Sequence, residues 1–402
     1  MANLLWGKVY YQDVFAGYLR EEPGNAMSFT YDPSYLDVLK PAIAHTLPLL
    51  EGPFLSQDGL HPFFDNLVAE GWLEQAQTRL LGKRRLSRFE LLLAFGQDCA
   101  GAVSIVDPEQ QKLSQAMIDL DDPKEIALLT SRASLSGVQP KITLVEQDGK
   151  LTPARSNELS THIAKFRSQG HDDLLVNEYL TTQAFQKLLP QDDVAQLSIR
   201  EIEGFSEPAL IIKRFDRIDG KRVHFEEFNQ LLDKKSNEKY NAAYQEMASF
   251  IKKTKDSIPA EIYRLYGRIL AGILLGNTDM HLKNFAMFHR PEGLRLTPSY
   301  DQVSAELYNY TSLALAIGGA ANLRISHVRP KHIIALGQEF EIPLSAIDML
   351  IKQLAIRLEE AKQVILEASM GDSSFKDKLI HLMDTRWNQT FALIGQTLSK
   401  KR

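Results

Sequence analysis

The chain has 402 residues, of which 44 % are hydrophobic, and its 46 basic and 51 acidic side chains give a formal net charge of -5. This length exceeds the roughly 250–300 residues at which a single hydrophobic core stops growing, so we expect subdomains. The slight acidic excess argues against the broad phosphate-backbone footprint of nucleic-acid-binding proteins, so that any DNA reading would fall to a partner.

Cysteine content and the N-terminal segment bear on the compartment. The single cysteine, Cys99, excludes an intrachain disulfide, and nothing in the cysteine content points to an oxidising compartment. The first residues lack the charged segment, apolar run and cleavage site of a signal peptide, and no apolar run approaches the length of a membrane span. We therefore expect a cytoplasmic protein with no membrane association.

The first elements along the chain predict a β-rich N-terminal subdomain over residues 1–110. Apolar and polar residues roughly alternate from Leu4 to Arg20 with a break at Phe15–Gly17, which is a weak hairpin signal. Further elements follow the hairpin: helices over His61–Leu81 and Leu86–Phe95, and a short strand over Ala102–Val106.

A polar stretch over Asp107–Lys124 predicts a linker, with a boundary near Asp122. Beyond it, segments 123–240 predict a small sheet crossed by one helix over Asp172–Leu189. The predicted strands are Lys141–Val145, Thr161–Phe166, Gln196–Ile202, Ala209–Phe215 and Arg222–Phe225.

The remaining residues, 241–402, predict a mainly helical region. Two short strand candidates, Asn284–His289 and Leu294–Pro298, interrupt it. Helical periodicity covers Asn241–Lys253, Ala260–Leu275, Pro330–Leu336, Ser345–Ala368 and Phe375–Ser399.

The most informative stretch is Gly276–Asn284, which follows a strongly apolar helical segment and places Asp279 and Asn284 five residues apart. In protein kinases this spacing lets the aspartate accept the proton of the substrate hydroxyl while the asparagine oxygen holds a magnesium ion. A second carboxylate, Asp301, follows seventeen residues beyond Asn284, after the two strand candidates. Carboxylate and amide oxygens suit the hard cation that neutralises a triphosphate.

Taken alone, this spacing is a weak match, because an aspartate that caps a helix and a solvated asparagine are more common than a kinase loop. The order of the elements favours the kinase interpretation. An apolar helix, Asp279, paired strands and Asp301 follow one another as in a kinase C-lobe. However, Tyr300 precedes Asp301 and no Phe-Gly follows it.

Three further segments fit a nucleotide site, each with an ordinary structural alternative. Ser134–Lys141 leads into a strand and could present N–H groups to phosphates, although its single glycine is more typical of an ordinary turn. Lys165 precedes a helix bearing Glu178, in the order of the kinase phosphate-pairing lysine and its partner, although each alone is more typical of a solvated side chain. Lys213–Arg217 lies where a kinase hinge contacts adenine, and Phe215 would pack either on the purine or in the core.

Several segments together resemble the HipA family of toxin kinases, over nearly the whole chain. In the N-terminal part these are Phe63–Leu67 and Gly96–Val103. In the kinase part they are Ser134–Lys141, Thr161–Lys165, Asn177–Tyr179, Arg214–Arg217, Thr278–Phe285 and Pro298–Asp301. The resemblance implies an α+β fold of the bilobal protein-kinase type, with a small β-rich N-terminal subdomain, a mixed α/β N-lobe and a mainly helical C-lobe.

The resemblance also implies a site and its cofactors, ATP and Mg²⁺. Asp279 would be the catalytic base, and Asn284 and Asp301 would hold the metal. The implied ATP contacts are Ser136, Gly137, Val138, Gln139, Pro140, Lys141, Lys165, Lys213, Arg214, Phe215, His281, Leu282, Lys283, Asn284, Tyr300 and Asp301. Ser134 lies where the family carries its autophosphorylated serine, and Ser136 is a second candidate.

The family is typically encoded beside a helix-turn-helix antitoxin, so the resemblance implies a HipB-like partner that mainly binds the operator DNA. It also implies a protein target, an aminoacyl-tRNA synthetase, whose modification blocks translation and promotes growth arrest and persistence. Pro140 departs from the family, in which many members carry glutamate, and the compact, charged Gln230–Tyr240 leaves the antitoxin interface open. A small-molecule or lipid kinase and a co-repressor module with a vestigial kinase site are the alternatives.

Overall fold

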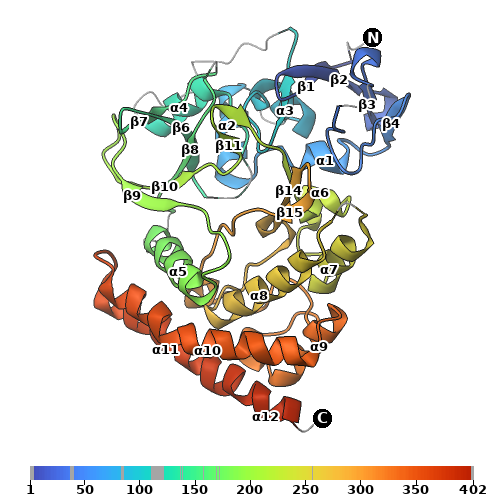
Figure 1. Ribbon diagram of the computed structural model, residues 1–402. Coiled ribbons are helices and arrows are strands. Elements are labelled where there is room, and N and C mark those ends of the chain that lie inside the picture. Colours follow the sequence, from blue (N-terminus) through green and yellow to red (C-terminus); the bar gives the residue numbers. More distant parts are fainter. Residues whose placement is uncertain are drawn as a thin grey trace. The chain divides into compact units, whose positions relative to one another are not determined.

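The computed structural model describes residues 4–36, 40–82, 86–109, 122–135, 137, 139–156, 158–168, 170–171, 173–255 and 257–399. The chain forms two compact units (Figure 1). The N-terminal unit consists of Met1–Ser168 and Gln196–Ser236, and the C-terminal unit consists of Gln169–Ala195 and Asn237–Arg402. The predicted segment 1–110 and most of 123–240 lie in the N-terminal unit, whereas the helix predicted between the middle strands lies in the C-terminal unit.

The N-terminal unit begins with an antiparallel sheet whose described strands have the order β4-β3-β2-β1-β5. They are β1 (Trp6–Tyr11), β2 (Val14–Glu21), β3 (Met27–Tyr31), β4 (Pro53–Ser56) and β5 (Val103–Val106). The predicted hairpin is present, but its turn is Gln12–Asp13, where both residues have the positive φ of a tight hairpin turn, and not Phe15–Gly17. Gly17 lies inside β2, where glycine is needed because a Cβ would come within 2.2 Å of the Thr30 carbonyl oxygen.

The described helices of the N-terminal unit are short. They are α1 (Pro62–Asp65), α2 (Gly71–Leu80), α3 (Arg88–Phe95), α4 (Pro123–Ser131) and α6 (Phe228–Leu231). The single helix predicted over His61–Leu81 is wrong, because Gly71 has a φ of 60° and a continuous right-handed helix cannot run through it. Pro123 and Lys124, expected in a linker, open α4 instead, and the Asp122 side chain accepts a hydrogen bond from the Lys124 N–H. Most of that predicted linker, 110–121, lies outside the described residues.

The second sheet of the N-terminal unit has the order β7-β6-β8-β10-β9. Its strands are β6 (Lys141–Gln147), β7 (Lys150–Pro153), β8 (His162–Lys165), β9 (Leu197–Arg200) and β10 (Ala209–Lys213). The sequence predicts all of them except β7, which follows a turn at Asp148–Gly149 with positive φ. The strand predicted over Arg222–Phe225 is wrong, because β12 (Lys221–Arg222) ends there against β11 (Arg217–Ile218) and β13 (Phe225–Glu227) begins only later.

Among the described residues of the N-terminal unit, two hydrophobic clusters contribute to the core. Buried residues of the first sheet and its helices make up one cluster, which includes Val9, Phe29, Phe63, Phe64 and Leu92. Buried residues of the second sheet and of the helices packed on it make up the other, with Leu73, Phe95, Ile142, Ala164 and Ile211. Helix α3 contributes to both clusters, so the two sheets of this unit share one continuous helical support.

The C-terminal unit is mainly helical. Its helices are α5 (Leu174–Leu188), α7 (Tyr244–Lys253), α8 (Ala260–Leu274), α9 (Pro330–Glu339), α10 (Leu344–Glu367), α11 (Ser373–Gln389) and α12 (Ile394–Ser399). A hairpin of β14 (Ala286–Arg290) and β15 (Gly293–Leu296) follows α8, as predicted. The single helix predicted over Phe375–Ser399 is wrong, because Thr390 has a φ of -132° and donates its hydroxyl to the Val328 carbonyl oxygen at 2.8 Å. Within the described residues, we find no helix with the length and apolarity needed to cross a bilayer.

Candidate active site

The predicted catalytic loop begins where helix α8 ends. Gly276 has a φ of 74°, and a Cβ there would lie 2.8 Å from Ser304 Oγ, so glycine suits both the turn and the close approach. The Asp279 N–H donates to Asn277 Oδ1 at 3.1 Å, and the Thr278 hydroxyl donates to the Tyr310 carbonyl oxygen at 2.6 Å. These bonds fix the backbone on both sides of Thr278 and leave the Asp279 side chain exposed to solvent.

The Asp279 carboxylate has a partner that its sequence neighbours do not supply. The Tyr240 hydroxyl donates to Asp279 Oδ1 at 2.9 Å, and the Tyr240 ring lies edge-on to the His281 ring at 5.0 Å. The protein atoms around the carboxyl displace part of its water and raise the pKa of Asp279 to about 6. The bond from Tyr240 opposes this rise, the Asp301 charge adds to it, and the Lys239 charge opposes it. A carboxyl that titrates near neutral pH is suited to accept a proton from a hydroxyl.

Asn284 and Asp301, the predicted metal ligands, lie side by side. Asn284 Nδ2 donates to Asp301 Oδ2 at 2.9 Å, and Asn284 Oδ1 accepts from the His281 N–H at 3.1 Å. The hairpin of β14 and β15 joins the two residues and returns the chain to the same place. Two neighbouring ligands of an octahedral Mg²⁺ lie about 2.9 Å apart, so an amide oxygen in place of the Asn284 nitrogen would complete such a pair with Asp301. These residues therefore fit a hard divalent cation.

The other predicted contacts of the C-terminal unit lie around this pair. The Tyr300 hydroxyl donates to the Lys283 carbonyl oxygen at 2.7 Å, which ties the residue before Asp301 to the residue before Asn284. Leu282 is fully buried, and its N–H donates to the Lys239 carbonyl oxygen at 3.2 Å. The structure thus brings together the two ends of the predicted motif, which the spacing in the sequence does not by itself establish.

In the N-terminal unit, Lys165 lies on the central strand β8 and is only 8 % exposed. Its backbone pairs with Lys141 of β6 and Leu210 of β10. Gly137 has a φ of 98°, and a Cβ at this residue would come within 2.5 Å of Lys141 Nζ. The predicted phosphate loop therefore approaches the Lys141 ammonium. Lys141 starts β6, and Lys165 ends the neighbouring strand β8.

The ends of that loop are anchored within the N-terminal unit. Gln139 Nε2 donates to the Phe166 carbonyl oxygen at 2.8 Å, and the Pro140 carbonyl oxygen accepts from the Phe166 N–H at 2.9 Å. Ser134 is buried, and its hydroxyl donates to the Leu67 carbonyl oxygen at 2.7 Å. Two other predicted loop residues, Ser136 and Val138, lie outside the described residues.

The predicted hinge over Lys213–Phe215 is occupied by internal bonds. The Lys213 N–H donates to the Gln196 carbonyl oxygen, and the Arg214 N–H donates to the Thr161 carbonyl oxygen, both at 3.0 Å. The Arg214 side chain is buried within the protein, so a nucleotide contact by this residue would have to come from its main chain. Phe215 lies edge-on to Phe225 at 5.2 Å.

A buried charge cluster explains the direction of the Arg214 side chain. Asp98 accepts from Arg214 and Arg217 at 3.2 and 2.8 Å, and Asp216 accepts from the same two side chains at 2.8 and 2.7 Å. Burial alone would raise the pKa values of the two aspartates, but the arginine charges outweigh it and lower both. Arg222 adds a third guanidinium, 3.3 Å from Asp98. This charge cluster joins the segment before β5 to the predicted hinge.

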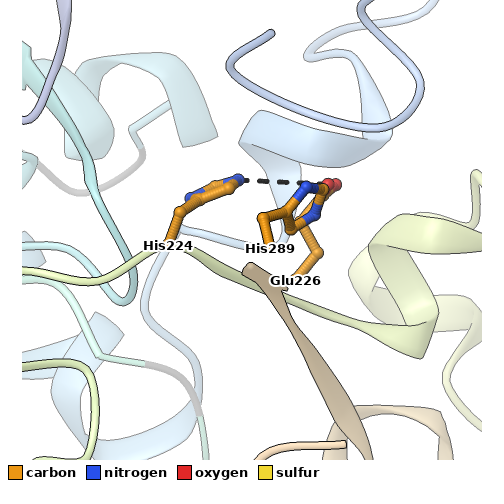
Figure 2. Close-up of side chains that lie close together, drawn as sticks. All are labelled: His224, Glu226 and His289. Carbon is orange, nitrogen blue, oxygen red and sulfur yellow. Dashed lines mark ion pairs between the residues drawn. The ribbon is translucent and has the colours of Figure 1, made fainter. Parts of the chain in front are cut away.

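A second set of contacts ties the same regions together. Figure 2 shows His224 and Glu226, both buried, with His224 Nε2 4.0 Å from Glu226 Oε1. Glu226 also accepts from the His45 N–H at 2.7 Å, and the His224 ring lies edge-on to Tyr11 at 5.2 Å. The segment that follows the hinge is therefore attached to β1 by a ring contact and to the connection between β3 and β4 by a hydrogen bond.

Comparison with known proteins identifies the chain. Residues 7–106 match the HipA N-terminal domain, and residues 133–362 match the HipA-like C-terminal domain. The chain belongs to the HipA family. The resemblance stated from the sequence is confirmed, and the family places this HipA-like chain among the serine/threonine-protein kinases.

Relatives and a solved structure agree with this. A putative kinase of Sinorhizobium fredii is 24 % identical, covering 89 % of this chain and 91 % of its own. The serine/threonine-protein kinase toxin HipA of Shewanella oneidensis is 27 % identical, covering 81 % of each chain. A chain of the solved S. oneidensis complex of HipA, HipB and operator DNA covers 98 % of this chain and 99 % of its own at 23 % identity, with a TM-score of 0.78. This likeness confirms the predicted kinase-like bilobal fold.

Three residues at or beside the predicted site were not among those predicted from the sequence. Tyr240 contacts Asp279, Asn177 contacts the segment after Asp301, and Asp98 contacts Arg214. Asn177 and Asp98 stand inside segments that carry the family resemblance, and this was the only signal for them. No local spacing marks Tyr240, because it precedes Asp279 by 39 residues.

Proposed function

We propose that this HipA-like chain transfers the γ-phosphoryl group of ATP to a serine or threonine hydroxyl of a protein. The contact between Asn284 and Asp301, with Asp279 on the same loop as Asn284, carries the proposal. Asn284 and Asp301 would hold Mg²⁺, which when bound would supply positive charge to offset the negative charge of the phosphates.

The chain's own residues divide the remaining work. Tyr240 holds Oδ1 of Asp279, which leaves Oδ2 to accept the proton of the attacking hydroxyl. In the N-terminal unit, Lys165 and the loop that ends at Lys141 would bind the phosphates, since the two lysines are paired residues of the neighbouring strands β8 and β6. The predicted hinge Lys213–Phe215 would bind the adenine.

Transfer of label from γ-labelled ATP tests this proposal. The wild-type chain should label itself or a protein acceptor only when Mg²⁺ is present, whereas Asp279→Asn and Asp301→Asn should lose the transfer. Asp377→Asn is the matched control, because this exposed aspartate of α11 lies in the same unit and outside the site. Asp301→Asn with more than about a tenth of wild-type transfer would contradict the metal assignment.

We further propose a HipB-like antitoxin as partner and an aminoacyl-tRNA synthetase as target, which would place the reaction in the cytoplasm. The solved relative contains HipB and operator DNA, and this supports the first part. The target rests on the family resemblance alone. Incubation with labelled ATP and a panel of purified synthetases tests it, and no labelled synthetase in the panel would overturn it. Because the chain carries a net charge of -5, it should shift operator DNA only together with the antitoxin.

A further inference from the structure

Asn177 makes two hydrogen bonds to the backbone of one distant residue. It lies on α5, is fully buried, and its Nδ2 donates to the Ser304 carbonyl oxygen at 3.1 Å. Its Oδ1 accepts from the Ser304 N–H at 2.8 Å and from the Thr181 hydroxyl at 2.9 Å. The amide side chain therefore bonds both the N–H and the carbonyl oxygen of Ser304, as a neighbouring strand would. Helix α5 is in this way bonded to the segment that follows Asp301.

That segment is held on both sides of Asp301. Before Asp301 in the chain, the Ser299 N–H donates to the Asp193 carbonyl oxygen at 2.7 Å. Gln302 Nε2 donates to Ser299 Oγ at 3.0 Å, while Gln302 Oε1 accepts from Asn277 Nδ2 at 3.2 Å. After Asp301, the segment is held at Ser304 by the two hydrogen bonds with Asn177. Asp301 thus lies in a short span with both ends fixed to other elements.

The backbone of Asp301 needs such support. Its φ is 58°, in the left-handed region that residues with a side chain rarely occupy. A residue keeps this conformation when the surrounding bonds determine it, and it relaxes when they are removed. Relaxation would turn the Asp301 carboxylate away from Asn284, to which it is now bonded.

We propose that Asn177 is a positioning residue that holds the carboxylate of Asp301 in place for a divalent cation. The inference rests on the proposed function, because that function makes Asp301 a metal ligand. It also assigns a task to Asn177, the first residue of the Asn177–Glu178 pair, which the kinase comparison leaves unexplained. Any displacement of α5 would move Ser304, and with it the metal site.

Three variants test the proposal in the full-length chain. Asn177→Ser removes both bonds to Ser304. Asn177→Asp keeps the shape and the acceptor for the Ser304 N–H but sets an oxygen against the Ser304 carbonyl. Thr182→Val is the matched control, because it removes a buried hydroxyl of the same helix that has no hydrogen-bond partner among the described residues.

Two measurements are needed. The first is hydrogen exchange of the peptide over residues 299–306, which should speed up in both Asn177 variants and not in Thr182→Val. The second is the Mg²⁺ concentration at which ATP stabilises the fold against heat. Asn177→Ser should raise this midpoint about ten-fold and Asn177→Asp by less, because buried backbone groups lose their partners.

The outcomes separate this inference from the proposed function. If Asp301→Asn raises the Mg²⁺ midpoint and neither Asn177 variant does, the metal assignment stands and the positioning role is wrong. If Asp301→Asn leaves the midpoint unchanged, the metal assignment falls, and the positioning role with it. Should Asn177→Ser fail to fold, the isosteric Asn177→Asp decides, and wild-type exchange and midpoint in that variant would overturn the proposal.

Discussion

The Tyr240 hydroxyl donates a hydrogen bond to Oδ1 of Asp279 across 39 residues of sequence. The contact between the Tyr240 ring and His281 holds the phenol from a second side. Because the bond from Tyr240 fixes Oδ1, it also fixes the rotation of the Asp279 carboxylate and so the direction in which Oδ2 points. Tyr240 therefore orients the predicted catalytic base, and its hydrogen bond also opposes the rise in the pKa of Asp279 that burial causes.

The pKa of Asp279, raised to about 6, predicts how the reaction depends on pH. A base must be unprotonated, so the rate should rise with pH through about 6 and level off above it. In Tyr240→Phe the bond that lowers this pKa is absent, so the midpoint should move to higher pH. Profiles of kcat/KM from acid to mildly alkaline pH measure the shift. Tyr310→Phe, at an exposed tyrosine, is the control, and equal midpoints in all three proteins would disprove the role of Tyr240.

Asp98→Asn should destabilise the N-terminal unit strongly. The change removes a negative charge from a buried cluster and leaves Arg214 and Arg217 to share Asp216. Breaking a buried ion pair on one side costs about 3–5 kcal/mol, which urea unfolding would record. Asp58→Asn, at a side chain that is 89 % exposed, should change stability by less than about 0.5 kcal/mol. Similar losses in the two variants would mean that the cluster contributes little.

Phosphorylation of Ser134 should release its segment from the N-terminal unit. The hydroxyl is buried and bonded to the Leu67 carbonyl oxygen, and a phosphate adds a charge of about -1.5 to -2, which this environment cannot accommodate. After incubation with MgATP, mass spectrometry should find phosphate on Ser134, and the modified protein should bind ATP more weakly. Ser134→Ala should abolish the modification. Ser136→Ala, at the second candidate serine, should leave it in place. Phosphate that persists in Ser134→Ala and disappears in Ser136→Ala would transfer the role to Ser136.

Lys165→Ala should weaken MgATP binding by about ten-fold or more, because a buried ammonium on β8 is lost from the predicted phosphate site. Titration calorimetry with a non-hydrolysed ATP analogue would measure the change. Lys150→Ala offers a matched control at an exposed lysine of the same sheet. Wild-type affinity in Lys165→Ala would show that the phosphates bind elsewhere.

What the sequence predicts well is local. Asn284, the hairpin of β14 and β15, and Asp301 follow one another within a short stretch, so the alternation of residues predicts the hairpin that turns the chain back. The contact between the two side chains is seen only in the structure. The long helices α8 and α10 are predicted for the same reason, since their periodicity is continuous. Breaks are harder, because Gly71 and Thr390 interrupt helical patterns through backbone angles that periodicity does not show.

The parts that the sequence does not predict depend on distant pairs. Asn177 contacts Ser304 across 127 residues, and Asp98 contacts Arg214 across 116. No spacing rule applies at such separations, because the intervening chain decides which residues meet. The interpretation of Arg214 shows the effect. Its place after an apolar strand suggests a hinge, whereas its side chain is directed into a charge cluster that only the fold assembles.

The charge cluster also determines how this polypeptide could be divided. A fragment ending at residue 109 would carry Asp98 without its arginines, and a fragment beginning at residue 122 would carry those arginines with Asp216 as their remaining acidic partner in the cluster. Neither piece could bury these charges by itself. Together they supply both the aspartates and the arginines of the cluster. Made as two separate polypeptides, the pieces should behave as the subunits of an obligate heterodimer, each recovering its structure only in the presence of the other.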